Sequence, residues 1–394
     1  QLEGVAARLR DAERWLGEVV GERPVYADEE DFQRLPGLVA MYHAGMALIR
    51  GDVAGTMQYA RRVMALARAD DAFIRGAASA LMGLASWTEG DLETAHQMFA
   101  GGMGYLQKAG FISDVIGGSL TLSDIRITQG RLREALSNYE RGLQLATQPG
   151  GQPLRGAADM LVGMSEIYRE YNELDAATQY LRRSKELGEL NGLPKNPYRS
   201  RVALARILAA RGEFDGALNL LDEAERVYEG DFSPNFRPVA AIRARLWIMA
   251  GRFSQAHNWA REQGLSAGDD LSYLREFEHI TLARLLLAQA RIDGGDSSIG
   301  EVLGLLERLR QAAEDGGRLG SAIEILVLQS LAHQVQGDLP AALVQLERAL
   351  TLAEPAGYVR VFVDEGAGLA QLLEEATRRG IRPHYARRLL SAFA

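Results

Sequence analysis

Residues 129–145 of the chain read QGRLREALSNYERGLQL, and this pattern predicts the fold. Glycine, here Gly130, readily adopts the left-handed backbone conformation that commonly ends a helix. Leu132 follows two places later and opens an amphipathic run with apolar residues at helical spacing. Ala135 is small enough to let two helix backbones approach, and Tyr139, one turn later, should fill the space between them. The stretch therefore predicts a helical hairpin and its turn.

Similar turns recur along the chain at a spacing of roughly 40 residues, which is typical of a solenoid. They are expected at Gly51, Gly90, Gly130, Asn172, Gly212, Gly251, Ala290 and Gly337. The apolar residue after each turn is Val53, Leu92, Leu132, Leu174, Phe214, Phe253, Ile292 or Leu339. We therefore predict an all-α fold, a right-handed superhelical solenoid of antiparallel helix pairs.

Two columns of small residues accompany the turns and should mark where the helices of each pair cross closely. The column before the turns is Ala44, Gly83, Ser123, Ser165, Ala205, Ala244, Ala283 and Ser330. The column after them is Thr56, Ala95, Ala135, Ala177, Ala217, Ala256, Gly295 and Ala342, with Thr56 and Gly295 as weaker matches. The glycine-rich run Gly101–Gly104 lies inside a helical stretch and is interpreted as another close-packing face.

The sequence predicts one array with a terminal cap. Residues 1–354 should form the repeat array, beginning with a helix over 2–20 and a loop over 21–31. From Tyr358 a β-branched run precedes two short helical stretches, and terminal repeats must cover an exposed apolar face. Residues 355–394 are therefore expected to be the C-terminal capping segment of the same solenoid. Links rich in proline and glycine are interpreted as spacers: 148–154, 191–197, 230–238, 264–270 and an insertion at 293–300 that lengthens the turn after Ala290.

Composition argues against several classes of function. The chain has 394 residues, a net charge of −8 and no cysteine, so a basic nucleic-acid binder, a disulfide framework and a thiolate site are all disfavoured. No membrane span, signal peptide or phosphate-binding loop is visible. The six histidines lack metal-ligand spacing on a shared helix face. We expect a cytoplasmic chain that is not an enzyme, holds no cofactor or metal, and contacts neither nucleic acid nor membrane.

The inner surface of the array is the predicted binding site. In stacked helix pairs of this kind the first helix of each pair lines the concave side, and the residue after the first small column should point there. In chain order this row is Gly45, Leu84, Asp124, Glu166, Arg206, Arg245, Arg284 and Leu331. Neighbouring rows add Asp159, Arg169, Arg199 and Trp87. Arginine forks suit carboxylates, phosphates and sugar hydroxyls, and an aromatic ring offers a stacking face.

Two interpretations of this row stay open. Its charged and aromatic residues, Asp124, Glu166, Arg206, Arg245, Arg284, Arg199, Asp159, Arg169 and Trp87, are candidate ligand-binding residues. Alternatively, Asp124 and Glu166 pair with nearby arginines and only keep a wide groove hydrated. Trp247 and Tyr168 should face the partner helix and belong to the core.

Four stretches give the chain a family resemblance. They are LRGAADMLVGMSEIYRE (154–170), LDEAERVYEGDFSPNFRPVAAIRARLWI (221–248), LSYLREFEHITLARLLLAQ (271–289) and EPAGYVRVFVDEG (354–366). In this order they resemble the tetratricopeptide-like (TPR-like) helical region of the MalT-like large ATP-binding LuxR-type transcriptional regulators. The resemblance implies a fragment of a longer regulator, with ATP-binding and DNA-binding modules that lie outside this sequence.

The resemblance also implies a role. The helical region of such regulators is thought to receive an inducer or a regulatory partner and to control ATP-dependent self-association. We expect a small-molecule effector or regulatory protein in the concave groove, and self-association of the parent protein. The alternative is a TPR scaffold that binds a peptide or partner protein and no small molecule.

Overall fold

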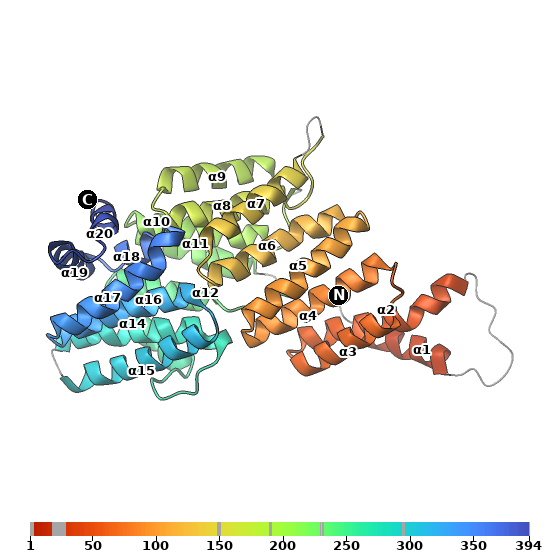
Figure 1. Cartoon of the computed structure of the whole chain (residues 1–394), viewed down its shortest axis with the longest axis horizontal. Helices are drawn as coiled ribbons and strands as arrows, with labels where there is room; N and C mark the ends of the chain where they lie inside the picture. Colours follow the sequence, from red (N-terminus) through yellow and green to blue (C-terminus); the bar gives the residue numbers. More distant parts are fainter. Residues whose placement is uncertain are drawn as a thin grey trace. The chain divides into compact units, whose positions relative to one another are not determined.

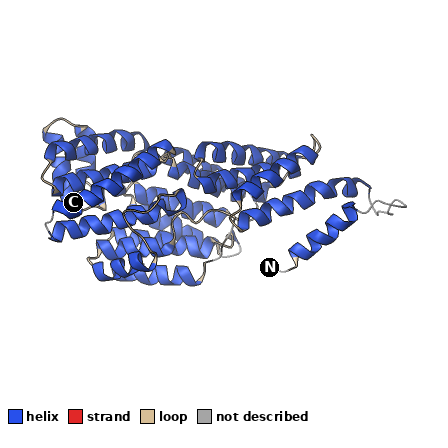
Figure 2. Ribbon diagram, turned by 90° about the horizontal axis from the view of Figure 1, so that it is seen from below, coloured by secondary structure: helices blue, strands red, loops and turns tan. Residues whose placement is uncertain are grey.

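The computed structural model describes residues 4–17, 29–147, 151–188, 191–228, 230, 232–293 and 296–393. Within these ranges the chain consists of helices joined by turns and loops, without a strand (Figures 1 and 2). The described part contains 20 α-helices, α1 to α20, which follow one another as antiparallel pairs. The all-α prediction is confirmed. No helix of the described residues is long and apolar enough to cross a bilayer.

The chain divides into two compact units, and the division falls inside α6. The first unit comprises Gln1–Gly118 and Asp231–Pro234, and the second comprises Ser119–Gly230 and Asn235–Ala394. The first unit holds α1 (Val5–Gly17), α2 (Glu29–Ile49), α3 (Val53–Leu66), α4 (Ala72–Glu89), α5 (Leu92–Lys108) and the start of α6 (Ile112–Thr128).

The second unit continues the pairs from the end of α6. Its next helices are α7 (Leu132–Ala146), α8 (Ala157–Glu170), α9 (Leu174–Leu187), α10 (Asn196–Ala210), α11 (Phe214–Arg226), α12 (Val239–Met249) and α13 (Phe253–Glu262). They are followed by the 3-10 turn η2 (Tyr273–Arg275), α14 (Glu276–Asp293), α15 (Asp296–Asp315), α16 (Leu319–Val335) and α17 (Leu339–Ala353). The C-terminal segment holds η3 (Glu354–Ala356), α18 (Arg360–Val363), α19 (Ala367–Arg378) and α20 (Pro383–Leu390).

The hairpin turns share one hydrogen-bond pattern. After α6, the N–H of Gly130 donates to Ile127 O at 2.9 Å and the N–H of Arg131 donates to Arg126 O at 2.8 Å. These two bonds satisfy carbonyls that the helix end leaves free, and they need a left-handed residue between them. Positive φ angles occur at Gly51, Gly90, Gly130, Asn172, Gly212, Gly251 and Gly337, which confirms these predicted turns.

The predicted turn at Ala290 is wrong. Ala290 lies inside α14, which continues to Asp293, and its side chain is only 1% exposed. Alanine favours helix and resists the left-handed conformation, so nothing at this position ends the helix. Ile292 is 67% exposed and does not open the next helix, while α15 begins at Asp296, so most of the expected insertion is helical. Gly295 lies outside the described residues, as do most of the predicted loop over 21–31, the end of the predicted helix over 2–20, and residues 148–150.

Close crossing of paired helices is confirmed. Ser123 is fully buried and its Oγ donates to Ala135 O at 3.1 Å, so a side chain of α6 touches the backbone of α7. Tyr139 of α7 is 1% exposed, and its ring packs against α8, where a Cβ built on Gly163 would overlap it, while its hydroxyl reaches Asp124 of α6. In the first unit a Cβ on Gly83 would lie 2.8 Å from the backbone nitrogen of Phe99.

The glycine-rich run packs closely at only one of its glycines. A Cβ on Gly102 would lie 2.8 Å from Gly76 O, whereas Gly101 and Gly104 face open space.

The helices of the second unit also meet at long range. A Cβ on Gly130, after α6, would lie 3.0 Å from the Cβ of Leu319, the first residue of α16. A Cβ on Gly320 would in turn lie 2.9 Å from Ile127 O near the end of α6. The carbonyl end of α6 therefore abuts the N–H end of α16, which is the favourable arrangement of helix dipoles. Helices that are far apart in the sequence are therefore in contact within the second unit.

Candidate functional site

The charged residues of the predicted inner row lie on the first helices of successive pairs. Asp124 is on α6, Glu166 on α8, Arg206 on α10, Arg245 on α12 and Arg284 on α14. Their side chains are 22%, 23%, 26%, 17% and 16% exposed, respectively. Each of these charged side chains has an oppositely charged partner among the described residues.

The first group surrounds Asp124. Arg199 donates to both carboxylate oxygens of Asp124, at 3.1 Å and 3.3 Å, and the Tyr139 hydroxyl donates to Oδ1 at 3.3 Å. Burial raises the pKa of Tyr139 and the Asp124 carboxylate raises it further, so the phenol stays protonated. Burial alone would lower the pKa of Arg199, but Asp124 more than offsets this. Predicted pairing of Asp124 with a nearby arginine is thus observed.

Asp159 lies beside this group and is fully buried. Its Oδ2 accepts a hydrogen bond of 2.8 Å from the backbone N–H of Leu193, whereas Oδ1 has no hydrogen-bond partner among the described residues. Burial raises the pKa of Asp159. An unpartnered buried carboxylate oxygen costs free energy, and the nearby Arg199 lowers the pKa of Asp159 and so partly offsets the effect of burial.

The second group lies on α8 and α10. Glu166 forms an ion pair with Arg206, which is the other pairing that the sequence suggested. Burial lowers the pKa of Arg206, and the neighbouring cations Arg169 and Arg237 act in the same direction as burial. Glu166 raises the pKa of Arg206 but does not offset the effect of burial and of these cations.

Arg169 is engaged with residues that the row did not predict. Its guanidinium pairs with Glu170 at 3.3 Å and with Asp364 of the C-terminal segment. Burial alone would lower the pKa of Arg169, but these two carboxylates raise it. Arg169 is therefore a structural partner of the segment after α17.

The third group joins α12, α14 and α16. Arg245 and Arg284 both contact the same oxygen of Glu324, Oε1, at 2.8 Å and 2.9 Å. Arg284 also pairs with Glu365. Burial would raise the pKa of Glu324, but the two arginines more than offset this and lower it to about 2. Burial lowers the pKa of Arg245, and the neighbouring Arg284 and Arg237 lower it further, while Glu324 only partly offsets these effects.

The aromatic ring of Phe277, on α14, lies close to two arginine side chains. The Arg245 guanidinium lies 3.6 Å from the centroid of Phe277, and that of Arg237 lies 5.9 Å from the same centroid. In the part of the chain that the structure describes, Arg237 has no carboxylate within ion-pair distance. The surface around Phe277 therefore carries positive charge that its own carboxylates do not fully neutralise.

Sequence reasoning missed Arg237 and Glu324. Arg237 belongs to the link 230–238, which was interpreted as a spacer. Glu324 lies seven residues before Leu331 of the predicted row, hence two turns earlier on the same helix face. The same offset leads from Arg206 to Arg199 and from Arg284 to Phe277, so a second row could have been read from the sequence.

Trp87 does not belong to the site. Its side chain is fully buried in α4 of the first unit, so it offers no stacking face. Because aromatic side chains bury large areas in cores, this position is explained by packing. Tyr168 packs against a core cluster formed by α8, its partner helix α9 and α10, as predicted.

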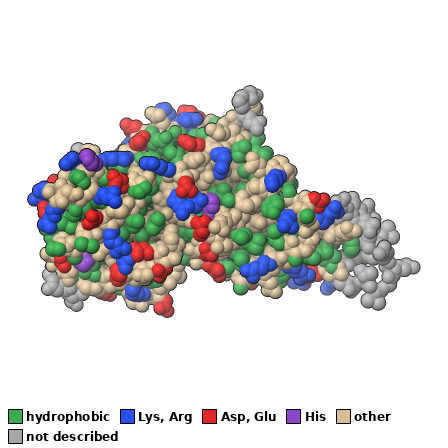
Figure 3. Space-filling view, in the orientation of Figure 1, with side chains coloured by type: hydrophobic (Ala, Val, Ile, Leu, Met, Phe, Trp, Pro, Cys, Tyr) green, Lys and Arg blue, Asp and Glu red, His purple; other side chains and the backbone are tan. Residues whose placement is uncertain are grey.

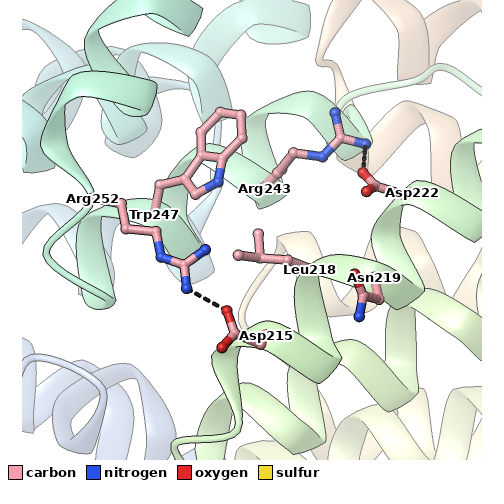
Figure 4. Close-up of a pocket in the computed structure, with 7 residues that line it drawn as sticks. All are labelled: Asp215, Leu218, Asn219, Asp222, Arg243, Trp247 and Arg252. Carbon is pink, nitrogen blue, oxygen red and sulfur yellow. Dashed lines mark hydrogen bonds and ion pairs between the residues drawn. The ribbon is translucent and has the colours of Figure 1, made fainter.

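Trp247 is only partly buried, although it contacts the predicted core. It also lines a cavity of about 440 Å³ with Asp215, Leu218, Asn219, Asp222, Arg243 and Arg252 (Figure 4). The cavity lies between α11, α12 and the start of α13, away from the inner row. Its charges pair internally, Arg252 with Asp215 and Arg243 with Asp222. It offers little that would hold a charged ligand.

The described residues contain no group of three or more histidine, aspartate or glutamate side chains that could hold a metal ion. On the face shown in Figure 3, basic and acidic side chains are intermingled.

Comparison with known proteins places the chain in a family. Residues 37–379 match the family described as the MalT-like TPR region. The chain is 26% identical over 282 residues to the HTH-type transcriptional regulator MalT of Yersinia pestis (strain Pestoides F), which covers 69% of this chain and 30% of that protein. It is 26% identical over 278 residues to MalT of Klebsiella pneumoniae subsp. pneumoniae, covering 68% of this chain and 29% of that protein. The match thus spans less than a third of these curated relatives.

The solved structures support the same fold. A Rap protein complexed with competence and sporulation factor superposes with a TM-score of 0.58, 12% sequence identity, and coverage of 89% of this chain and 92% of that chain. At this low identity, the superposition shows a shared TPR-like fold and gives no information about ligands. Because the family match extends over most of the sequence, the chain belongs to the family of MalT-like TPR regions.

Proposed function

We propose that this chain is the effector-sensing domain of a LuxR-type transcriptional regulator. An effector with an anionic group would bind on the inner side of the second unit, at Arg206, Arg237 and Arg245. By preferring one conformation it would bias the parent protein between a resting and an assembled state. ATP binding, DNA binding and self-association would belong to the parent, whose MalT relatives are named HTH-type transcriptional regulators.

The observation that supports this proposal is the pair of guanidinium groups around Phe277. One of them shares its carboxylate with Arg284, and the other has none among the described residues. Arginines in a partly buried setting form strong bidentate hydrogen bonds with carboxylates and phosphates. Asp124, Glu166, Asp159 and Arg199 would then contact the polar remainder of the ligand. We propose a non-catalytic, cytoplasmic role without a cofactor.

Thermal unfolding with a panel of carboxylated and phosphorylated metabolites tests the proposal. A ligand at 100 times its Kd should stabilise the chain by about 2.7 kcal/mol. Arg237→Ala should abolish the shift and leave the apo stability almost unchanged, because no carboxylate loses its partner. Arg206→Ala should also abolish the shift. Arg211→Ala, which removes an ion pair with the 96% exposed Asp175, is the matched control.

A scaffold that takes a peptide or partner protein is the second candidate. It is favoured by the C-terminal segment, which lies against α8 as a peptide ligand would. If no metabolite shifts the melting temperature while a partner protein binds stoichiometrically, this candidate replaces the effector proposal.

A further inference from the structure

The segment Tyr358–Glu365 lies across the end of α8, far from it in sequence. The backbone N–H of Val359 donates to Glu170 O at 3.1 Å, and the N–H of Val361 donates to Glu170 Oε1 at 2.9 Å. The first of these bonds satisfies a carbonyl at the C-terminal end of α8, which the helix itself leaves unpaired. Two successive contacts of this segment thus use its main chain.

The Arg360 side chain forms hydrogen bonds at the ends of two helices. Its guanidinium donates to Ala210 O, the last residue of α10, at 3.4 Å, and to Asn172 Oδ1, after α8, at 3.0 Å. A cation at helix C-termini is stabilised by their partial negative charge. Asn172 is the only non-glycine among the confirmed left-handed hairpin turns, and its side chain supplies an acceptor that glycine lacks.

Two acidic residues complete the contact. Asp364 pairs with Arg169 and with Arg360, and Glu365 pairs with Arg284. The side chains of Arg169 and Arg360 are only 9% and 8% exposed. Buried ion pairs are weak contributors to stability, because desolvation offsets their attraction, but they discriminate strongly between matching and mismatched partners.

The polar contacts exceed what a cap requires. A cap needs apolar cover, and the second half of the C-terminal segment supplies it through fully or almost fully buried side chains: Leu369, Leu372, Leu373 and Leu389. The part before α19 also buries Tyr358, Val359 and Phe362, and it adds main-chain bonds, one basic side chain and two acidic ones. This is the set of contacts by which a surface recognises a short peptide.

We propose that the ends of α8 and α10, together with Arg169 and Arg284, form a peptide-binding site that residues 358–365 occupy in cis. The site would accept from a partner a short segment in which an arginine is followed four and five places later by two acidic residues. Such a segment would displace the chain's own. The proposal is independent of an effector at Arg237.

A peptide in trans tests this site. The probe is a labelled peptide of sequence YVRVFVDEG, whose binding is followed by fluorescence anisotropy. Tethering gives the chain's own segment a high effective concentration, so wild type should bind the probe weakly. Arg360→Ala weakens the tethered competitor but leaves the site intact, and should bind the probe at least about tenfold more tightly than wild type.

Matched controls accompany this measurement. Arg378→Ala removes a 70% exposed arginine from the neighbouring α19 and should behave as wild type. A probe with alanine for its arginine and with asparagine and glutamine for its two acids should bind at least about tenfold more weakly. Failure of the folded Arg360→Ala protein to bind the probe overturns the proposal but leaves the effector proposal standing.

Hydrogen exchange of the wild-type chain is a second test, which can be used if Arg360→Ala does not fold. Displacement requires the segment to open while α8 stays folded, so the amides of Val359 and Val361 should exchange at least about a hundredfold faster than those in the middle of α8. Equal protection of both sets of amides, which indicates opening only by global unfolding, overturns the proposal.

Discussion

Asn172 performs two tasks at the scale of a single residue. Its φ of 63° closes the turn after α8, and its side chain accepts a hydrogen bond from Arg360. Asn172→Gly keeps the turn and removes the acceptor, so we expect the free energy of unfolding to fall by about 1.5–3 kcal/mol in a urea titration, as for a hydrogen bond to a charged group. Asn172→Asp retains the acceptor and should stay close to wild type. Equal stability of the two variants would show that the contact contributes nothing.

Ala135 tests the close crossing of α6 and α7. Its side chain is fully buried, and its carbonyl accepts the hydrogen bond from Ser123. Ala135→Leu overpacks this crossing and should destabilise the chain by roughly 1–3 kcal/mol in chemical denaturation. Ser137→Leu, at an exposed position two residues away on the same helix, should change stability by less than about 0.5 kcal/mol.

Residue-scale features were predictable where the physics is local. A left-handed turn, an amphipathic helix and a small residue at a crossing each follow a short periodic sequence pattern. The turn glycines and the small residues of both columns, apart from Gly295 outside the described residues, could therefore be predicted from one sequence. The partners of the inner row could not. Glu365 reaches Arg284 only because the chain returns after α17, and no periodicity encodes that return.

At the scale of helices, Gly130 serves both a turn and a long-range contact. Gly130 and Gly212 have nearly the same backbone conformation, with φ of 77° and 80°. Only Gly130 faces α16, whereas the space beside Gly212 is open. Each substitution to alanine costs about 1–2 kcal/mol for the left-handed conformation. Gly130→Ala should cost roughly 1–3 kcal/mol more, because its Cβ meets Leu319. Equal losses in denaturant titrations would argue against closure of α6 on α16.

Glu324 makes the junction of α12, α14 and α16 sensitive to acid. Its pKa is lowered from 4.5 to about 2 in the folded chain, so its contribution is complete above pH 4.5 and is lost as the pH falls towards 2. The shift corresponds to roughly 3 kcal/mol of unfolding free energy. Glu324→Gln should be less stable than wild type at pH 7. When the pH is lowered towards 2, its free energy of unfolding should fall by roughly 3 kcal/mol less than that of wild type. Glu347→Gln, at an exposed position of α17, should keep the wild-type dependence in the same pH series.

Helix boundaries were predictable except where no glycine marks them. The turn at Ala290 was inferred from spacing alone, and α14 continued because alanine, glutamine and arginine all favour helix. Conversely, the β-branched residues after Tyr358 contain the single helical turn α18. Its conformation is set by contacts with α8 and α16, which are remote in sequence, and tertiary context overrides local preference there.

At the scale of the whole molecule, the two units differ in how their contacts are distributed along the chain. In a simple solenoid each repeat contacts only its neighbours, so unfolding can begin anywhere. The second unit also has contacts from α6 to α16 and from α8 to α18, which tie distant repeats together. Its helices from the end of α6 to α17 should therefore unfold as one cooperative block, separately from the first unit, while the segment that holds α18 can open locally.

Urea unfolding followed by hydrogen exchange and mass spectrometry tests this division. We expect two transitions, with α2 to α5 in one and α7 to α17 in the other. Gly83→Ala creates a clash inside the first unit, where its Cβ would lie 2.8 Å from the backbone nitrogen of Phe99, and should lower only the first midpoint. Ala135→Leu should lower only the second. A single transition that both substitutions shift equally would mean that α6 transmits stability across the division, and the chain would then unfold as one continuous array.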